Sequence, residues 1–105
     1  MSLEDKVEYV SEDIIQSIFN KGQYYERMLN GELTAKVRSD RIPKRQKKGH
    51  PPGTRSQYVV YYDVNNNPVA GVHQYLLPDG TLGASGRPDP KVIFLPERTI
   101  KLAHE

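Results

Sequence analysis

The residues of this chain best suited to chemistry are the lysines and arginines in the middle of the sequence. Between positions 36 and 55 there are eight basic residues and one acidic residue, Asp40. Such a cluster creates a positive potential that attracts the phosphates of a nucleic acid. The residues expected to contact phosphates are Lys44, Arg45, Lys47, Lys48 and Arg55. Two alternatives stay open: a solvated loop that only keeps the chain in solution, or a loop that docks on an acidic helix of a second copy.

Tyrosines are concentrated just after this basic segment. Four of the seven, Tyr58, Tyr61, Tyr62 and Tyr75, lie in one predicted hairpin. Aromatic side chains on a sheet beside a cationic segment are typical of platforms on which single-stranded bases stack. Because neighbouring residues of a strand point to opposite faces, Tyr61 and Tyr62 cannot share a platform. We expect Tyr58 and Tyr62 to contribute to nucleic-acid binding, and ordinary strand packing is the alternative.

A histidine and two cations suggest a different chemistry. His73 lies in a predicted strand, and Arg87 and Lys91 follow in the next loop. A general base beside positive charge is what a metal-independent ribonuclease needs, because attack by a 2′-hydroxyl requires both. In outline, a helix followed by a sheet in a small chain with a basic loop resembles small bacterial toxin ribonucleases, at the level of fold only. The simpler alternative is a partly buried histidine hydrogen-bonded to a neighbour, and on balance we expect no enzyme.

The loop from 83 to 91 is the last candidate. Its two glycines free the backbone to point amides at an anion, with the set Ser85, Gly86 and Arg87 as the binding residues. The loop matches no phosphate-loop template. The alternative is a rigid connection between strands in which Arg87 pairs with Asp89.

Several classes of protein are excluded or disfavoured by composition. The chain contains no cysteine, which excludes disulfides and thiolate chemistry and fits a reducing compartment. The three histidines, His50, His73 and His104, lack the paired spacing of metal ligands, so we expect neither a metal nor a cofactor. No apolar run approaches the length of a membrane span, and the first residues are acidic. We therefore expect a cytoplasmic protein without a membrane partner.

The elements that must position these residues begin with a helix. Ser11, followed by two acidic residues, is typical of a helix start, and Asn30-Gly31 is typical of a stop. The apolar spacing between them predicts one amphipathic helix over 12–30. Gly22 lies on its apolar face, where it either permits close packing or divides the helix. Residues 3–10 either extend the helix or form a short strand.

Strands follow the helix. We predict them at 33–38, 57–64, 69–77, 92–95 and 99–102, the first with a cationic outer face. If Val64 faces Val69, Tyr58 lies opposite Tyr75. The stretch 39–56 has too few apolar residues to offset the entropy of ordering, which predicts a flexible basic loop.

The whole chain, 1–105, is the size of one domain. Its fold class is predicted as α+β, with one N-terminal amphipathic helix on a mostly antiparallel sheet of four to six strands. Open sheet edges in so small a chain leave a third functional possibility, a homodimeric protein-interaction module without catalytic activity. The leading expectation is an accessory protein that binds RNA or single-stranded DNA non-specifically through its basic loop.

Overall fold

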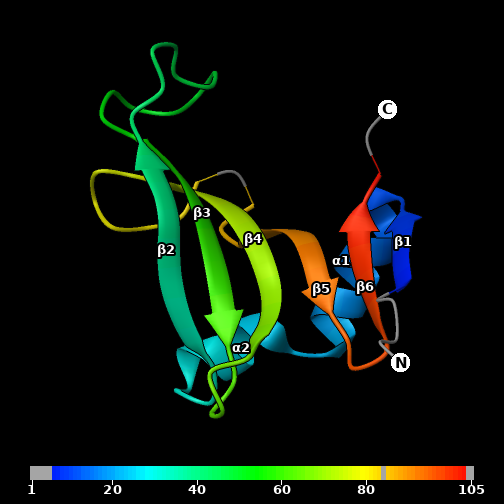
Figure 1. Cartoon of the computed structure of the whole chain (residues 1–105). Coiled ribbons are helices and arrows are strands. Elements are labelled where there is room, and N and C mark those ends of the chain that lie inside the picture. The colour runs from blue at the N-terminus through cyan, green and yellow to red at the C-terminus, as the bar shows by residue number, and fades with distance from the viewer. Residues whose placement is uncertain (1–5, 84, 104–105) are drawn as a thin grey trace.

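The computed structural model describes residues 6–83 and 85–103, which form a mixed α+β fold. Two helices pack on one face of a six-stranded sheet whose strand order is β1-β6-β5-β4-β3-β2 (Figure 1). The helices are α1 (Glu12–Lys21) and α2 (Tyr24–Leu29). The strands are β1 (Lys6–Val10), β2 (Thr34–Arg41), β3 (Arg55–Tyr62), β4 (Pro68–Leu76), β5 (Asp89–Phe94) and β6 (Arg98–Leu102).

The prediction of an N-terminal helix is wrong, because a strand precedes both helices. β1 pairs in parallel with β6, whereas all other neighbouring strands are antiparallel. The β-branched residues Val7 and Val10 favour this extended backbone. Val10 also packs on the core, which gives the strand an apolar anchor that a surface extension of the helix would lack.

The predicted single helix over 12–30 is two helices. Ser11 caps α1 by accepting from the amide of Ile14, and the break falls at Gly22 and Gln23. Gln23 has φ 54° and ψ 34°, a left-handed conformation that cannot continue a right-handed helix. A Cβ at Gly22 would lie 2.5 Å from the ring of Tyr24, so the glycine admits that ring. The break between the helices therefore accompanies burial of the Tyr24 ring.

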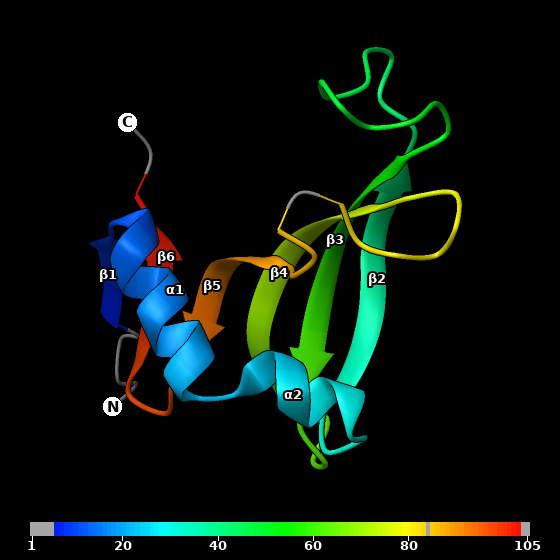
Figure 2. The same ribbon diagram turned by 180° about the vertical axis from the view of Figure 1, so that it is seen from behind.

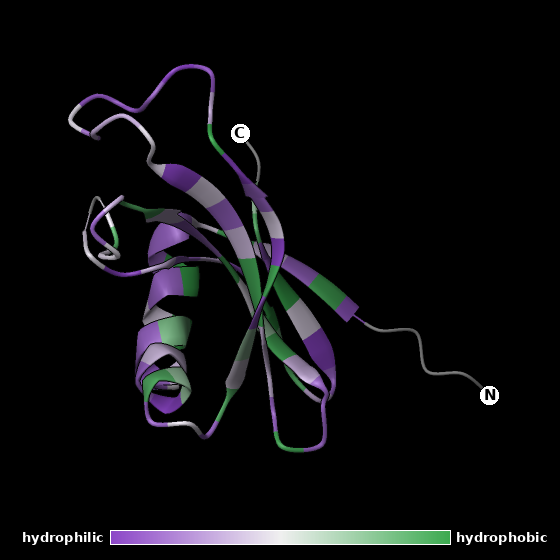
Figure 3. Cartoon of the chain, turned by 90° about the vertical axis from the view of Figure 1, so that its left-hand side faces the viewer, coloured by the Kyte–Doolittle hydropathy of each residue, from purple (hydrophilic) through white to green (hydrophobic). Residues whose placement is uncertain are grey.

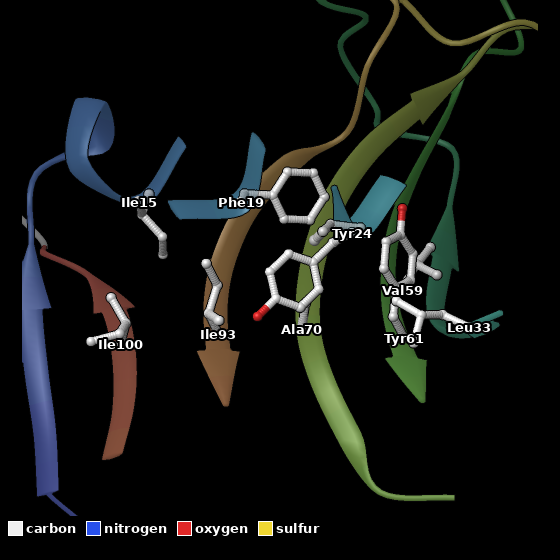
Figure 4. Close-up of a cluster of buried hydrophobic side chains, with 10 residues drawn as sticks. Ile15, Phe19, Tyr24, Leu33, Val59, Tyr61, Ala70, Ile93 and Ile100 are labelled. Carbon is white, nitrogen blue, oxygen red and sulfur yellow. The ribbon is translucent and has the colours of Figure 1, made fainter. Parts of the chain in front are cut away.

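The core lies between the helices and the sheet (Figure 4). Ile15 and Phe19 of α1 are buried against Ile93 and Ile100 of the sheet. The ring of Phe19 stacks on that of Tyr24, with centroids 5.6 Å apart. Burial of side chains of this size contributes about 1.5–3 kcal/mol each, so this cluster holds the helices on one face of the sheet.

The basic loop is shorter than the predicted 39–56. Residues 39–41 belong to β2 and residues 55–56 to β3, because the ladder between these strands continues through Arg41 and Ser56. The remaining connection, 42–54, is largely hydrophilic and projects beyond the end of the sheet (Figure 3).

The hairpin of β3 and β4 has a different register from the one predicted. Tyr58 lies opposite His73, two residues from the expected partner, Tyr75. The difference arises because β4 begins at Pro68 and the register shifts beside Tyr62. A shift of two residues leaves each side chain on its predicted face, so the expected division of the tyrosines is unaffected. Neither helix of the described chain is long and apolar enough to span a membrane.

Candidate nucleic-acid interface

The two faces of the sheet have different surroundings. Along β3, Gln57, Val59 and Tyr61 are buried on the side that carries the helices. Alternate residues, including Tyr58 and Tyr62, point to the other side. Figures 1 and 2 show the helices behind the sheet in one view and in front of it in the opposite view. We call the side without helices the open face.

Strand register and helix packing divide the seven tyrosines of the chain between these faces. The tyrosines on the open face are Tyr9, Tyr58, Tyr62 and Tyr75. The tyrosines on the helix side are Tyr24, Tyr25 and Tyr61, which pack in or against the core. Four of the seven tyrosines thus lie on the side that no helix covers, where they do not fill the core.

Tyr58 reaches across the open face because Gly71 on the neighbouring strand has no side chain. A Cβ at Gly71 would collide with the hydroxyl end of Tyr58 and lie 2.7 Å from a methyl carbon of Val92. The ring therefore lies over β4 and reaches toward β5, an arrangement in which an aromatic residue covers a glycine in a sheet. Burial raises the pKa of Tyr58, and the neighbouring Tyr62 raises it further, so this hydroxyl stays neutral.

Six cations share the open face with these aromatic rings. They are Lys36, Arg38 and Arg41 of β2, Lys91 of β5, Lys101 of β6 and Lys47 of the loop. The ammonium of Lys36 lies 4.8 Å from the ring centroid of Tyr62, and the guanidinium carbon of Arg38 lies 5.2 Å from it. The ammonium of Lys47 lies 5.3 Å from the centroid of Tyr75. These are cation–π distances, so three of the six positive charges lie beside flat rings.

Carboxylates of the described residues form no ion pair with these six cations. The ion pairs among residues 6–83 and 85–103 are Arg27–Glu32, Arg55–Asp40, Arg87–Glu26 and Arg98–Glu8. None contains an open-face cation, and none contains Lys44, Arg45 or Lys48. Of the five predicted phosphate contacts, Arg55 alone is paired, through its Nε at 2.6 Å from Asp40, and its guanidinium lowers the pKa of that carboxyl. Apart from Lys6 and Lys21, the cations outside these ion pairs thus lie on the open face or in the basic loop.

The basic loop projects beyond the sheet but contacts its end through His50. The ring centroid of His50 lies 4.7 Å from that of Tyr75, and a Cβ on Gly83 would lie 2.7 Å from the His50 ring. Thr54 is fully buried and donates from its hydroxyl to the carbonyl of Pro51 at 2.8 Å. These contacts place Lys47 over Tyr75, so the loop extends the open face.

His73 lies at the centre of the open face. Its Nε2 is 2.7 Å from the hydroxyl of Ser56, and its ring meets that of Tyr75 edge-on. Burial lowers the pKa of His73, and the charge of Lys91 lowers it further, against a smaller opposing effect of Asp89. The imidazole is therefore neutral near pH 7, as a base must be, but Ser56 occupies its Nε2.

Arg87 does not join His73 and Lys91. Its guanidinium contacts the helices, 2.9 Å from Glu26 and 5.0 Å from the ring centroid of Tyr25. The hydrogen bond from Arg87 lowers the pKa of Glu26. The predicted ribonuclease triplet is thus split between the two sides of the sheet. The alternative pairing with Asp89 is not seen either, because Glu26 takes that place.

The predicted anion loop folds on itself. Ser85 and Arg87 exchange hydrogen bonds between the serine hydroxyl and the Arg87 backbone at 3.3 Å, and Gly86 has φ 79°. Both side chains line a cavity of about 190 Å³ against α1, on the helix side. Because Glu26 already neutralises Arg87, this loop offers little free charge to an anion.

Sequence reasoning missed part of the open face. It selected Tyr58, Tyr62 and Lys47, and it noted a cationic outer face on the strand that became β2. It did not associate Tyr9 or Lys101 with them, because their placement depends on the parallel pairing of β1 with β6. Within the described part of the chain no group of three potential ligands is suited to a metal, and His104 lies outside it. Comparison with protein-family models, curated proteins and solved structures finds no match to this chain.

Proposed function

We propose that this protein binds single-stranded nucleic acid, RNA or single-stranded DNA, on the open face of its sheet and through its basic loop. One observation carries the proposal: four tyrosines and six cations free of ion pairs within the described chain gather on the side that no helix covers. Stacking and phosphate attraction are the two interactions that single strands offer.

The positions of these side chains indicate how a single-stranded nucleic acid would lie on the open face. Bases would stack on Tyr58, Tyr62 and Tyr75, and each stacked base contributes about 1–3 kcal/mol. Phosphates would meet Lys36 and Lys47, which already lie beside those rings. Duplexes fit this surface less well, because their bases are stacked on each other and cannot meet a tyrosine ring. Contacts of these kinds carry little sequence information, so binding is expected to be non-specific.

The ribonuclease alternative has less support. It requires Arg87 beside His73, whereas Arg87 contacts the helices. A homodimeric module remains compatible with the open edges of β1 and β2, but no contact favours it over binding of a strand.

Fluorescence anisotropy with a labelled oligouridylate, measured over a series of salt concentrations, tests the proposal. Affinity should fall steeply with salt. Replacing Lys44, Arg45, Lys47 and Lys48 by Gln should reduce the slope by about 0.7 for each phosphate that the variant no longer neutralises. Tyr62→Ala should weaken binding by about 1–3 kcal/mol. All five positions lie on the surface or rim, so these changes should leave the fold intact.

Lys21→Gln is the control, because it removes one charge on α1, away from the open face. It should lower affinity far less than Lys48→Gln does. Binding that is insensitive to salt, or equal losses for Lys21→Gln and Lys48→Gln, would refute the proposal.

A further inference from the structure

A groove lies at the other end of the open face. It has a volume of about 630 Å³ and is lined by Tyr9, Tyr58, Lys91, Val92, Phe94, Lys101 and Leu102. These residues come from β1, β3, β5 and β6. The volume falls within the range of small-molecule sites, about 300–1,000 Å³. None of the residues considered above for phosphate binding at the basic loop lines it.

The groove has an apolar floor between aromatic walls. Lys101 of β6 pairs with Tyr9 on one side and with Val92 on the other, and Val92 pairs with Gly71, over which Tyr58 lies. Tyr9 therefore stands toward the β1 edge and Tyr58 toward the centre of the sheet. Tyr9 is 63% exposed, much more than a tyrosine used for packing, so its ring is available to a ligand.

The charges of the groove are of one sign. Lys91 and Lys101 are exposed at its lining, neither belongs to an ion pair of the described chain, and no lining residue is acidic. A ligand that satisfies this site has a flat, largely apolar ring and one or two negative charges at its edge. A nucleobase with its flanking phosphates has that form, whereas an uncharged apolar ligand would leave both ammonium groups unused.

We infer that the groove holds one unstacked nucleotide of the bound strand, with the base against Tyr9 and Tyr58 and the flanking phosphates at Lys91 and Lys101. This inference rests on the proposed function and deepens it, because Tyr58 lines the groove and is also one of the rings proposed to stack on bases. The strand then crosses the whole open face, from the basic loop to β1, and one base leaves the stack at the groove.

Two variants in the full chain test the groove, with the oligouridylate as the probe. Tyr9→Ala should weaken binding at least about fivefold, because the base loses a ring on which to stack. Lys101→Gln should weaken binding and reduce the slope against salt by about 0.7. Both residues are exposed, and a far-ultraviolet spectrum and a melting curve will verify that each variant folds.

Lys6→Gln is the matched control. It removes the same charge from β1, but Lys6 lies opposite Arg98 in the β1–β6 ladder and points to the helix side. It should leave the slope nearly unchanged. A second arm uses uridine 3′,5′-bisphosphate, a single nucleotide with a phosphate on each side, which should shift the backbone resonances of Tyr9, Val92 and Lys101 and not those of the basic loop.

The outcomes separate this inference from the proposed function. If the wild type binds the oligouridylate and Tyr9→Ala and Lys101→Gln bind equally well, the groove inference is overturned and the proposed function stands. If the wild type does not bind the oligouridylate, both the groove inference and the proposed function are refuted. Losses in both groove variants but not in Lys6→Gln, with groove resonances shifted by the bisphosphate, support the inference.

Discussion

At the scale of single residues, small differences in surroundings decide what each side chain can do. His73 and His50 both contact the ring of Tyr75, but His73 is also hydrogen-bonded to Ser56 and lies near Lys91. Burial and the charge of Lys91 disfavour protonation of the His73 ring, so it is a neutral hydrogen-bonding group on the open face. Sequence could indicate a partly buried strand histidine bonded to a neighbour. It could not supply the partner, because Ser56 is reached only through the register of β3 and β4.

The lowered pKa of His73 predicts a pH dependence of stability. Between the usual histidine value of about 6.5 and the lower value in the folded protein, the unfolded chain binds more protons than the folded one. Stability contributed by neutral His73 is therefore present above about pH 6.5 and is lost as the pH falls through this window. Nuclear magnetic resonance titration of the His73 ring should give a midpoint below 6.5, and His73→Gln should flatten the stability profile there. A midpoint above 6.5 would contradict this account.

Gly71 predicts a second effect at a single position. In Gly71→Ala, the new methyl group would collide with Tyr58 and Val92. We expect the variant to lose about 1–3 kcal/mol of unfolding free energy, as overpacked sites do, and the ring of Tyr58 to move. Urea denaturation measures the first effect and the ring resonances of Tyr58 the second. Unchanged stability together with unchanged Tyr58 resonances would show that the ring does not cross Gly71.

At the scale of elements, the local pattern of residue types predicted most strands. It failed where an element is placed by contacts between residues far apart in the sequence. The hairpin of β3 and β4, the cap at Ser11 and the faces of the tyrosines follow from local residue types. The pairing of β1 with β6 joins residues more than 90 positions apart, and the partner of Arg87 lies on α2. No local period encodes such contacts. The groove depends on the pairing of β1 with β6, and for that reason sequence alone did not indicate it.

The break between α1 and α2 predicts a stabilising substitution. Gln23 adopts a left-handed conformation, which costs a residue with a Cβ about 1–2 kcal/mol and costs glycine nothing. Gln23→Gly should therefore raise the unfolding free energy by up to about 1 kcal/mol, after the greater freedom of glycine in the unfolded chain is deducted. Urea denaturation provides the measurement. A loss of stability would mean that the Gln23 side chain contributes more than its backbone conformation costs.

At the scale of the whole molecule, the two sides of the sheet differ in ion pairing as well as in packing. The helix side buries the core and contains ion pairs such as Arg87–Glu26 and Arg98–Glu8. The open face holds six cations outside these ion pairs, and three of them, Lys36, Arg38 and Lys47, lie beside aromatic rings. Because the net charge of the chain is only +2, it conceals this separation, and the strand register is needed to reveal it.

The tyrosines provide the most direct test of the central claim, because they form a reference set within one molecule. In a chain labelled at tyrosine rings, addition of the oligouridylate should shift the signals of the open-face set, Tyr9, Tyr58, Tyr62 and Tyr75. The helix-side set, Tyr24, Tyr25 and Tyr61, should keep its signals nearly unchanged. Shifts confined to the helix-side rings, or no shifts at saturating oligouridylate, would contradict the claim that the open face binds the strand.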